Sequence, residues 1–435
     1  MSLLHERSNE CTLSELDIFT APLTQMSIED KCYSENLPVT ALTDRGPLEF
    51  YVPGNGLHYL DLNDTLLSLR LKITNHDGSD IEADANVGII NYPLNTIFSQ
   101  CDVTLGDRLI SQASSTHAYR AIIETYLNYS EETLKTQFTA GLFYKDTAGS
   151  HDSHVVNNGP NRGLVRRAVY SERSREFHVI GPLHSDIFFC EKLLLNNVDL
   201  RIKLTRANDA FTLMAPENAN YHLNIVGASL FVRKVTVSPA VRVGHASALM
   251  HANALYPISR INVKTFSIPE NSRISHHENL FLGSLPRYLV IGMVNHEAFT
   301  GRYDLCPFNF QHNNLEFLAL CHESKQIPAK AFQPNFAENQ SVREFYSLYT
   351  ATGRNLKDLS LCIDRQEFEQ GYTLFVFNMN PSDDTQALSP VINGNLRLEM
   401  RFRVPLPHTT TLIVYACYDS ILEINSKRQV LVDNY

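Results

Sequence analysis

The side chains best suited to bind a metal gather in three short histidine groups, but their spacing does not build a metal site. The groups are His276-His277-Glu278, His296-Glu297 and Cys321-His322-Glu323. Imidazole, thiolate and carboxylate are ligands of zinc and of non-haem iron. Adjacent side chains of a strand point to opposite faces, so His276 and His277 can share one metal only from a loop. No HxH pair with a following Glu occurs. We therefore expect solvated loop histidines and predict no bound metal.

No motif for catalysis occurs elsewhere in the chain. The sequence lacks a phosphate loop, a Gly-rich dinucleotide turn, a nucleophile elbow and a zinc-protease helix motif. The eight cysteines form no CxxC pair, and several lie in apolar runs such as Phe188-Phe-Cys190 and Leu361-Cys-Ile363. They are expected to be buried structural thiols rather than disulfides or zinc ligands. We predict no catalytic residue, no cofactor and no enzymatic activity.

The charge balance argues against a surface that coats nucleic acid. The formal net charge is −10 at pH 7, whereas phosphate binding needs clustered Lys and Arg. The densest basic run lies in the segment Lys145 to Glu176, where six bases are diluted by four acids. Its arginines are Arg162, Arg166, Arg167, Arg173 and Arg175. We expect a solvated or inter-subunit loop here, and no direct sequence-specific contact with nucleic acid.

The chain lacks the signals of a membrane or secreted protein. Its best apolar stretch, Leu285 to Val294, is too short to span a bilayer and contains Arg287. The N-terminus carries charges where a signal peptide needs an apolar core. A soluble chain folded inside a cell is expected, with no membrane span.

Alternating apolar residues predict many strands with one buried face. Leu67, Leu69, Leu71 and Ile73 alternate with polar residues, and the run from Leu396 to Val404 alternates without a fault. Similar runs include Asp102 to Ile110, Phe177 to Ile180, Ile187 to Leu195, Leu200 to Leu204 and His222 to Val237. Such strands are typical of antiparallel sandwiches.

The order of these elements indicates an internal duplication. The stretch from Asn95 to Tyr126 predicts strand, turn, strand and helix, and an offset of 219 residues carries Asn95 to Asn314. The same offset carries the helical stripe Ile123, Tyr126 and Leu127 onto Val342, Phe345 and Tyr346. Later the offset falls to about 173, which aligns Leu200–Leu204 with Tyr372–Met379 and Leu223–Ile225 with Leu396–Leu398. The segment Lys145 to Glu176 is the candidate for the extra residues of the first half.

A chain of 435 residues with this repeat is expected to hold two domains. We predict an arm at 1–45, a first domain at 46–240, a second domain at 241–422 and a tail at 423–435. Strands, long loops and few helices in two copies favour an all-β fold, in which two sandwiches of the jelly-roll type are joined in tandem. The arm has eight acids and three bases, so it is no DNA-binding arm.

Three stretches resemble the major capsid proteins of Polinton (Maverick) elements and adintoviruses. They are Glu15 to Ile28, Pro93 to Ser111 and Thr411 to Tyr435. The resemblance extends over nearly the whole chain and is most specific at its two ends. It implies a double jelly roll, that is, two antiparallel eight-stranded sandwiches with short helices in the loops.

The resemblance also implies an assembly. In that family three chains form a pseudo-hexagonal capsomer, and capsomers tile an icosahedral shell around double-stranded DNA. The expected partners are two further copies, neighbouring capsomers and a penton or minor capsid protein. The expected location is the virion, after synthesis in the nucleus or cytoplasm of the host. The family has no catalytic residues to carry over.

Three alternatives remain at the level of sequence. A tandem jelly-roll binding module of the lectin type would need exposed aromatic residues, and the absence of tryptophan counts against it. A tandem cupin-like metalloenzyme would need the histidine groups described above. Because such elements integrate into animal genomes, a capsid-derived protein retained by a host is the third alternative.

Overall fold

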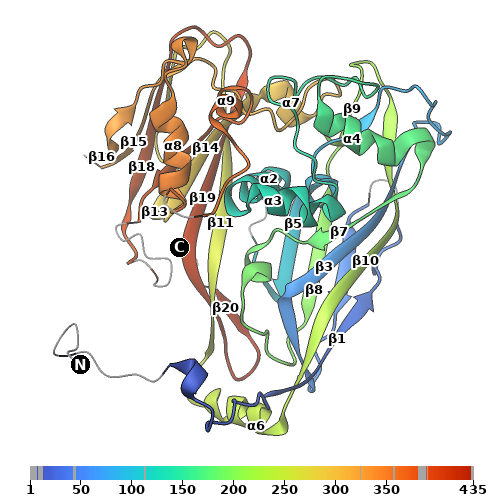
Figure 1. The fold of residues 1–435 in the computed structure, drawn as a ribbon, viewed down its shortest axis with the longest axis vertical. Coiled ribbons are helices and arrows are strands. Elements are labelled where there is room, and N and C mark those ends of the chain that lie inside the picture. The colour runs from blue at the N-terminus through green and yellow to red at the C-terminus, as the bar shows by residue number, and fades with distance from the viewer. Residues whose placement is uncertain are drawn as a thin grey trace.

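Two β-sandwiches stand side by side in the computed structural model (Figure 1). The structure describes residues 7, 13–42, 46–111, 114–323, 325–355, 358–380, 388 and 390–432. The first sandwich and the second follow one another along the chain and are connected at the base by α6 (Pro239–Ala248).

The first sandwich consists of two four-stranded antiparallel sheets. One sheet has the order β1 (Ile28–Asn36), β10 (Tyr221–Val237), β3 (His58–Asn75) and β7 (Phe177–Pro182). The other has the order β2 (Leu48–Val52), β8 (Leu200–Arg206), β5 (Phe98–Leu105) and β6 (Arg108–Leu109). A separate short pair joins β4 (Gly88–Ile89) to β9 (Leu213–Met214).

The second sandwich repeats this topology. One sheet has the order β11 (Ala254–Ile268), β19 (Thr410–Ile424), β14 (Tyr288–Asn295) and β17 (Leu374–Asn378). The other has the order β12 (Ile274–His277), β18 (Asn393–Phe402), β15 (Leu315–His322) and β16 (Lys325–Phe332). The short strands β13 (Leu282–Ser284) and β20 (Val430–Val432) pair with β18 and β19. Numbered by chain order within each half, the eight main strands form sheets 1-8-3-6 and 2-7-4-5 both times.

The strands form where the sequence alternates, because one face of each sheet is buried in a core. In β3, Leu67, Leu69, Leu71 and Ile73 have no exposed surface. In β18, Leu396, Leu398, Met400 and Phe402 are buried in the same way while the arginines between them face outward. Both predicted strands are confirmed.

Two helices occupy the same place in the two halves. Helix α2 (His117–Asn128) and helix α8 (Val342–Ala351) each lie between the fifth and the sixth strand of their sandwich. The predicted repeat of strand, turn, strand and helix is therefore confirmed as β5-β6-α2 and β15-β16-α8. Helix α4 (Arg162–Ser171) is as long as α8. The other helices are single short turns: α1 (Pro93–Thr96), α3 (Glu131–Lys135), α5 (Asp209–Thr212), α7 (His296–Thr300) and α9 (Arg365–Glu369).

The later part of the predicted repeat is wrong by one strand. Leu200–Leu204 lies in β8, which corresponds to β18 and not to β17, and Leu223–Ile225 lies in β10, which corresponds to β19. All these strands alternate alike, so the sequence pattern does not distinguish a strand from its neighbour. The expected insertion is present, since 48 residues separate α2 from β7 whereas 22 separate α8 from β17. The strand predicted at Ile187–Leu195 is also wrong, because its first residues form the 3-10 helix η4 (Asp186–Phe189).

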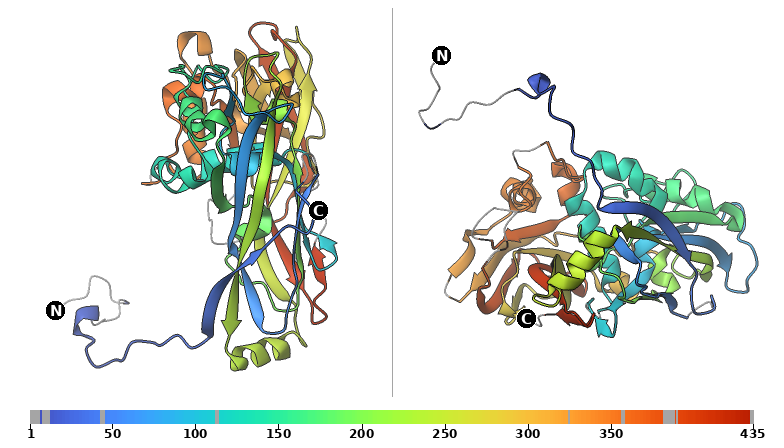
Figure 2. Two further views of the ribbon diagram at one scale, coloured as in Figure 1. Left: turned by 90° about the vertical axis from the view of Figure 1, so that its right-hand side faces the viewer. Right: turned by 90° about the horizontal axis from the view of Figure 1, so that it is seen from below.

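Parts of the predicted arm and tail belong to the sandwiches. Residues 28–36 of the arm form β1, which pairs with β10, and residues 430–432 of the tail form β20. Figure 2 shows the described residues before β1 leaving the body at its base, beside α6. The division into arm, two domains and tail stays a prediction, with these two strands as corrections at its edges.

Candidate functional site at the junction of the two sandwiches

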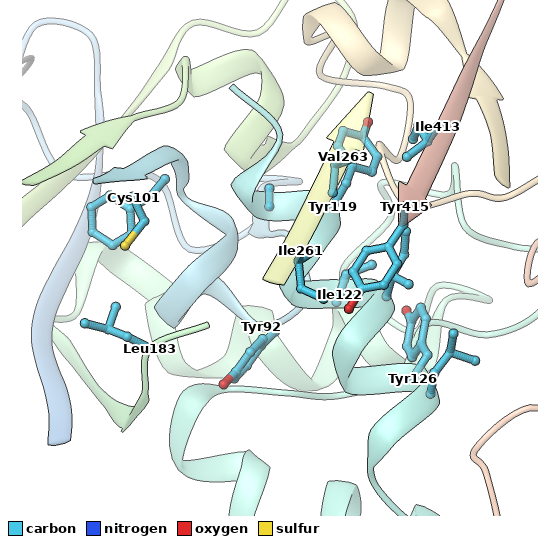
Figure 3. Close-up of a cluster of buried hydrophobic side chains, with 14 of the residues drawn as sticks. Tyr92, Cys101, Tyr119, Ile122, Tyr126, Leu183, Ile261, Val263, Ile413 and Tyr415 are labelled. Carbon is cyan, nitrogen blue, oxygen red and sulfur yellow. The ribbon is translucent and has the colours of Figure 1, made fainter. Parts of the chain in front are cut away.

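Helix α2 fills the space between the two sandwiches. Every residue of this helix except Asn128 is buried. In Figure 3, Tyr119, Ile122 and Tyr126 of the helix face β11 and β19 of the second sandwich. The Tyr126 ring lies 5.4 Å from that of Tyr372, and the Tyr119 ring stacks on Phe299 at 5.5 Å. Apolar and aromatic packing of this kind holds the two sandwiches as one body.

A buried ionic network lies within this apolar junction. Arg120 Nε donates to Glu124 Oε1 over 3.0 Å, one helical turn away, and Arg120 Nη2 lies 2.6 Å from Asp186 Oδ1. His184 Nδ1 lies 2.7 Å from the second oxygen of Glu124. One arginine thus serves two buried carboxylates from different parts of the first sandwich.

The second sandwich supplies two donors to the same carboxylates. The Tyr415 hydroxyl on β19 donates to Glu124 Oε1 over 3.3 Å, and the backbone N–H of Ile261 on β11 donates to Asp186 Oδ1 over 3.3 Å. The network therefore crosses the junction. Removing either carboxylate would leave buried donors in both sandwiches without an acceptor.

The environment shifts the two carboxyl groups in opposite directions. Burial alone raises the pKa of Glu124, but the Arg120 guanidinium and the hydrogen bond with His184 outweigh burial and hold the pKa at about 2. At Asp186, burial outweighs the same guanidinium, so its pKa is raised. Burial followed by the charge of Arg120 lowers the pKa of nearby His117 to about 3. Burial lowers the pKa of Arg120, but the charge of Asp186 and then that of Glu124 outweigh burial and raise it, so both carboxylates act as counter-charges.

A second contact across the junction comes from the start of the segment Lys145 to Glu176. Lys145 pairs with Glu367, and its ammonium lies 4.7 Å from the centre of the Tyr372 ring. The Asp152 carboxylate accepts from the Cys306 N–H over 2.8 Å and from Asn309 Nδ2 over 2.9 Å. The prediction of a solvated or inter-subunit loop is wrong for these residues, because they dock on the second sandwich of their own chain.

The arginines of this segment differ in burial. Arg167 on α4 is buried, with Nη2 2.7 Å from Asp146 Oδ1 and Nε donating to the Ile89 carbonyl over 2.8 Å. The others, Arg162, Arg166, Arg173 and Arg175, are exposed. An added Cβ at Gly163 would lie 2.3 Å from the Lys145 carbonyl oxygen, so the first turn of α4 packs directly on the docked residues.

The histidine groups are placed in regular structure and not in loops, which corrects the prediction. His276 and His277 lie in β12, and His277 Nε2 is 2.8 Å from Ser275 Oγ. His296 begins α7 and contacts Thr411 Oγ1 at 2.9 Å, whereas His322 ends β15. Across the described ranges, no group of three His, Cys, Asp or Glu side chains could hold a metal ion.

The described cysteines are all free. Five of them are buried, among them Cys190 and Cys362, whose apolar neighbours predicted it: Cys101, Cys190, Cys306, Cys362 and Cys417. Cys32 is exposed on the edge strand β1 and Cys321 is partly buried. In the described part of the chain, no helix has the length and apolar character needed to cross a membrane.

Sequence reasoning missed the residues of the ionic network. Arg120 and Glu124 stand four residues apart in a helix whose other buried positions are mostly apolar or aromatic, and that spacing was a usable signal of a pair. Asp186 and Tyr415 gave no signal, because only the fold brings them to the helix.

No family model matches the chain. Comparison with solved structures identifies its fold. The uncharacterized protein F54H12.2 of Caenorhabditis elegans is 24% identical over 429 residues, which cover 95% of this chain and 99% of that protein. A chain of the Sputnik virophage structure aligns with a TM-score of 0.63 and 13% identity, over 99% of this chain and 94% of that one. The mavirus major capsid protein aligns with a TM-score of 0.56 and 12% identity, over 100% and 95%. The predicted double jelly roll with short helices in its loops is confirmed.

Proposed function

We propose that this chain is a major capsid protein that acts by packing and not by catalysis. The observation that carries the proposal is the pair of eight-stranded sandwiches with identical strand order, joined through a buried junction. The alignment with the mavirus major capsid protein over 100% of this chain supports it. On this proposal the chain needs no cofactor, and its location is the shell of a virion.

Three copies would form the building block. A chain with two similar sandwiches presents two similar outer edges, so three chains place six sandwiches in a ring without sixfold symmetry. Interfaces of obligate assemblies bury roughly 2,000 Å² or more, and they cover sheet edges that would otherwise aggregate. Such capsomers would tile an icosahedral shell around double-stranded DNA, with a penton protein at the vertices. An acidic chain leaves compaction of the DNA to other components.

The described part of the N-terminal arm supports contacts beyond one chain. Its apolar side chains Leu16, Ile18, Phe19 and Leu23 are between 66% and 102% exposed. Water-exposed apolar residues in such a run mark an interaction site. We propose that the arm and the C-terminal tail contact neighbouring subunits in the shell.

Among major capsid proteins, we propose that the chain belongs with those of Polinton elements and adintoviruses. The relative from C. elegans, aligned over 95% of this chain, supports a source in an element carried by animal genomes. The same observation favours a second candidate, a capsid-derived protein that a host has retained and that no longer forms virions. The two candidates differ in whether the purified protein still closes into shells.

Light scattering of the purified protein followed by negative-stain imaging tests the proposal. A mass near three times 49.2 kDa is expected, together with hexagonal particles or hollow shells. A trimer that forms no shell under any condition would favour the retained protein. A monomer at micromolar concentration would refute the capsomer.

A further inference from the structure

The two sandwiches differ in what covers the outer face of their first sheet. In the second sandwich, Val263, Tyr415 and Val290 form a row across β11, β19 and β14, and all three are buried beneath the first sandwich. In the first sandwich, the matching row across β1, β10 and β3 is Glu35, Phe231 and Leu66. None of these three is fully buried.

The open face of the first sandwich is distinct from its core. Leu67 and Leu230 pair with one another in the core and have no exposed surface. Leu66 and Phe231, the next pair, therefore point away from the core. The apolar surface continues to Tyr33, which is 49% exposed, and to Ile180, which is 38% exposed. Within one chain, the described residues leave these apolar side chains partly exposed, beside the charged Glu35 and Arg70 of the same face.

The helix at the equivalent place in the second sandwich is exposed where α2 is buried. Val342 and Tyr346 of α8, one turn apart, are each 46% exposed. Beside them lies a groove of about 480 Å³ whose lining includes Pro328, Phe332 and Phe377. In Figure 1, α8 stands at the front of the second sandwich, and just after its C-terminal end Arg354 Nη2 donates to the Asn128 carbonyl at the end of α2 over 2.6 Å. Thus one chain has a partly exposed helix on its second sandwich and a partly exposed sheet face on its first.

We propose that α8 of one copy packs on the β1-β10-β3-β7 face of the next copy, as α2 packs on β11-β19-β14 within the chain. The contact between the first and the second sandwich of one chain is thereby repeated between the second sandwich of one copy and the first sandwich of the next. The contact joins two different surfaces, so it is heterologous. Such a contact closes into a ring of three only if it rotates each copy by about 120° relative to the one before. This inference rests on the proposed trimer and names its interface.

Two double variants and a matched control test the interface by light scattering. The helix variant carries Val342→Glu and Tyr346→Glu, and the face variant carries Tyr33→Glu and Ile180→Glu. The control carries Val243→Glu and Met250→Glu, at exposed apolar positions in and just after α6 at the base of the molecule. All three add the same charge at exposed sites, so a difference among them reports the location of the interface.

We expect the mass of the helix variant and of the face variant in solution to be 49.2 kDa, that of a single copy, instead of three times that value. The control should keep the mass of the wild type. An equal mixture of the two variants should form pairs of copies and nothing larger. In each pair the intact helix of the face variant binds the intact face of the helix variant, and the remaining surfaces are blocked. Pair formation also shows that both variants are folded.

The inference is overturned if both variants stay trimeric, or if their mixture stays monomeric although circular dichroism shows two folded proteins. A variant that does not fold is replaced by hydrogen exchange of the wild type. Amides of α8 and β1 should then exchange more slowly in the trimer than after dilution to the monomer, and equal rates would overturn the interface. A wild type that is itself monomeric refutes the proposed function instead, so the two failures are distinct.

Discussion

Replacing Glu124 by Gln tests whether the buried network stabilises the junction. The substitution keeps the shape of the side chain but removes the charge that faces Arg120 at 3.0 Å. The pKa of Glu124 lies at about 2 instead of its ordinary 4.5. Since each unit corresponds to 1.36 kcal/mol, the ionised form contributes on the order of 3 kcal/mol at neutral pH. Breaking a buried ion pair from one side costs roughly 3–5 kcal/mol, which agrees with this value.

The same chain offers an exposed pair as the control. Glu131 lies 2.6 Å from Lys135, also one turn along a helix, but these side chains are 46% and 61% exposed. Glu131→Gln should cost less than about 0.5 kcal/mol, because solvent screens such pairs. Urea unfolding followed by circular dichroism measures both variants. If Glu124→Gln loses no more stability than Glu131→Gln, the network does not hold the junction.

Acid should remove the difference between Glu124→Gln and the wild type. The pKa of folded Glu124 is lowered, so its contribution is complete above pH 4.5 and is lost as the pH falls toward 2. The stability gap should therefore be constant between pH 5 and 7 and should shrink below pH 4.5. A gap that is equally large at pH 3 would contradict the assignment of the shift to the ion pair.

Three further predictions concern the docked segment, the buried histidines and the arm. Gly371→Ala should destabilise by about 1–3 kcal/mol more than Gly353→Ala in thermal unfolding, because both glycines have positive φ but only the new Cβ at Gly371 would meet His151, at 2.4 Å. Burial lowers the pKa of His117 to about 3 and that of His151 to about 4, so the unfolded chain takes up protons first and the melting temperature should fall as the pH drops from 6.5 toward 4. His151→Gln should flatten that slope, and an unchanged slope would exclude His151 as its source. Deleting residues 1–27 should preserve the trimer mass and abolish shells; shells of the truncated protein in negative stain would remove the role of the arm.

The strands could be predicted because burial on one face imposes a period of two on the sequence. Leu67 to Ile73 and Leu396 to Phe402 carry that period, and both lie in strands with one buried face. The order of strands in the sheets leaves no such trace. For that reason the predicted alignment matched the strand at Leu200 with β17 and not with β18.

The junction could not be predicted because its residues depend on partners far along the chain. Arg167 is polar and lies in a segment rich in Gly, Ser and Asn, yet Asp146 and the Ile89 carbonyl satisfy it in the interior. Composition describes the average surroundings of such a segment, whereas burial of one arginine is decided by where a single carboxylate lies. The same holds for Asp186, which meets Arg120 across 66 residues of sequence.

The chemical difference between α2 and α8 suits the two contacts that we assign to them. Helix α2 carries Arg120 and Glu124 into the interior, where an unmatched charge is costly, so it fits only a surface that offers the donors of Tyr415 and Ile261. The outer side of α8 instead presents Val342 and Tyr346, which pack against apolar surface without a matching ion. A helix that packs within its own chain during folding gains specificity from a partner surface that must match its charges. A helix that packs on another copy gains from a surface that stays soluble before assembly.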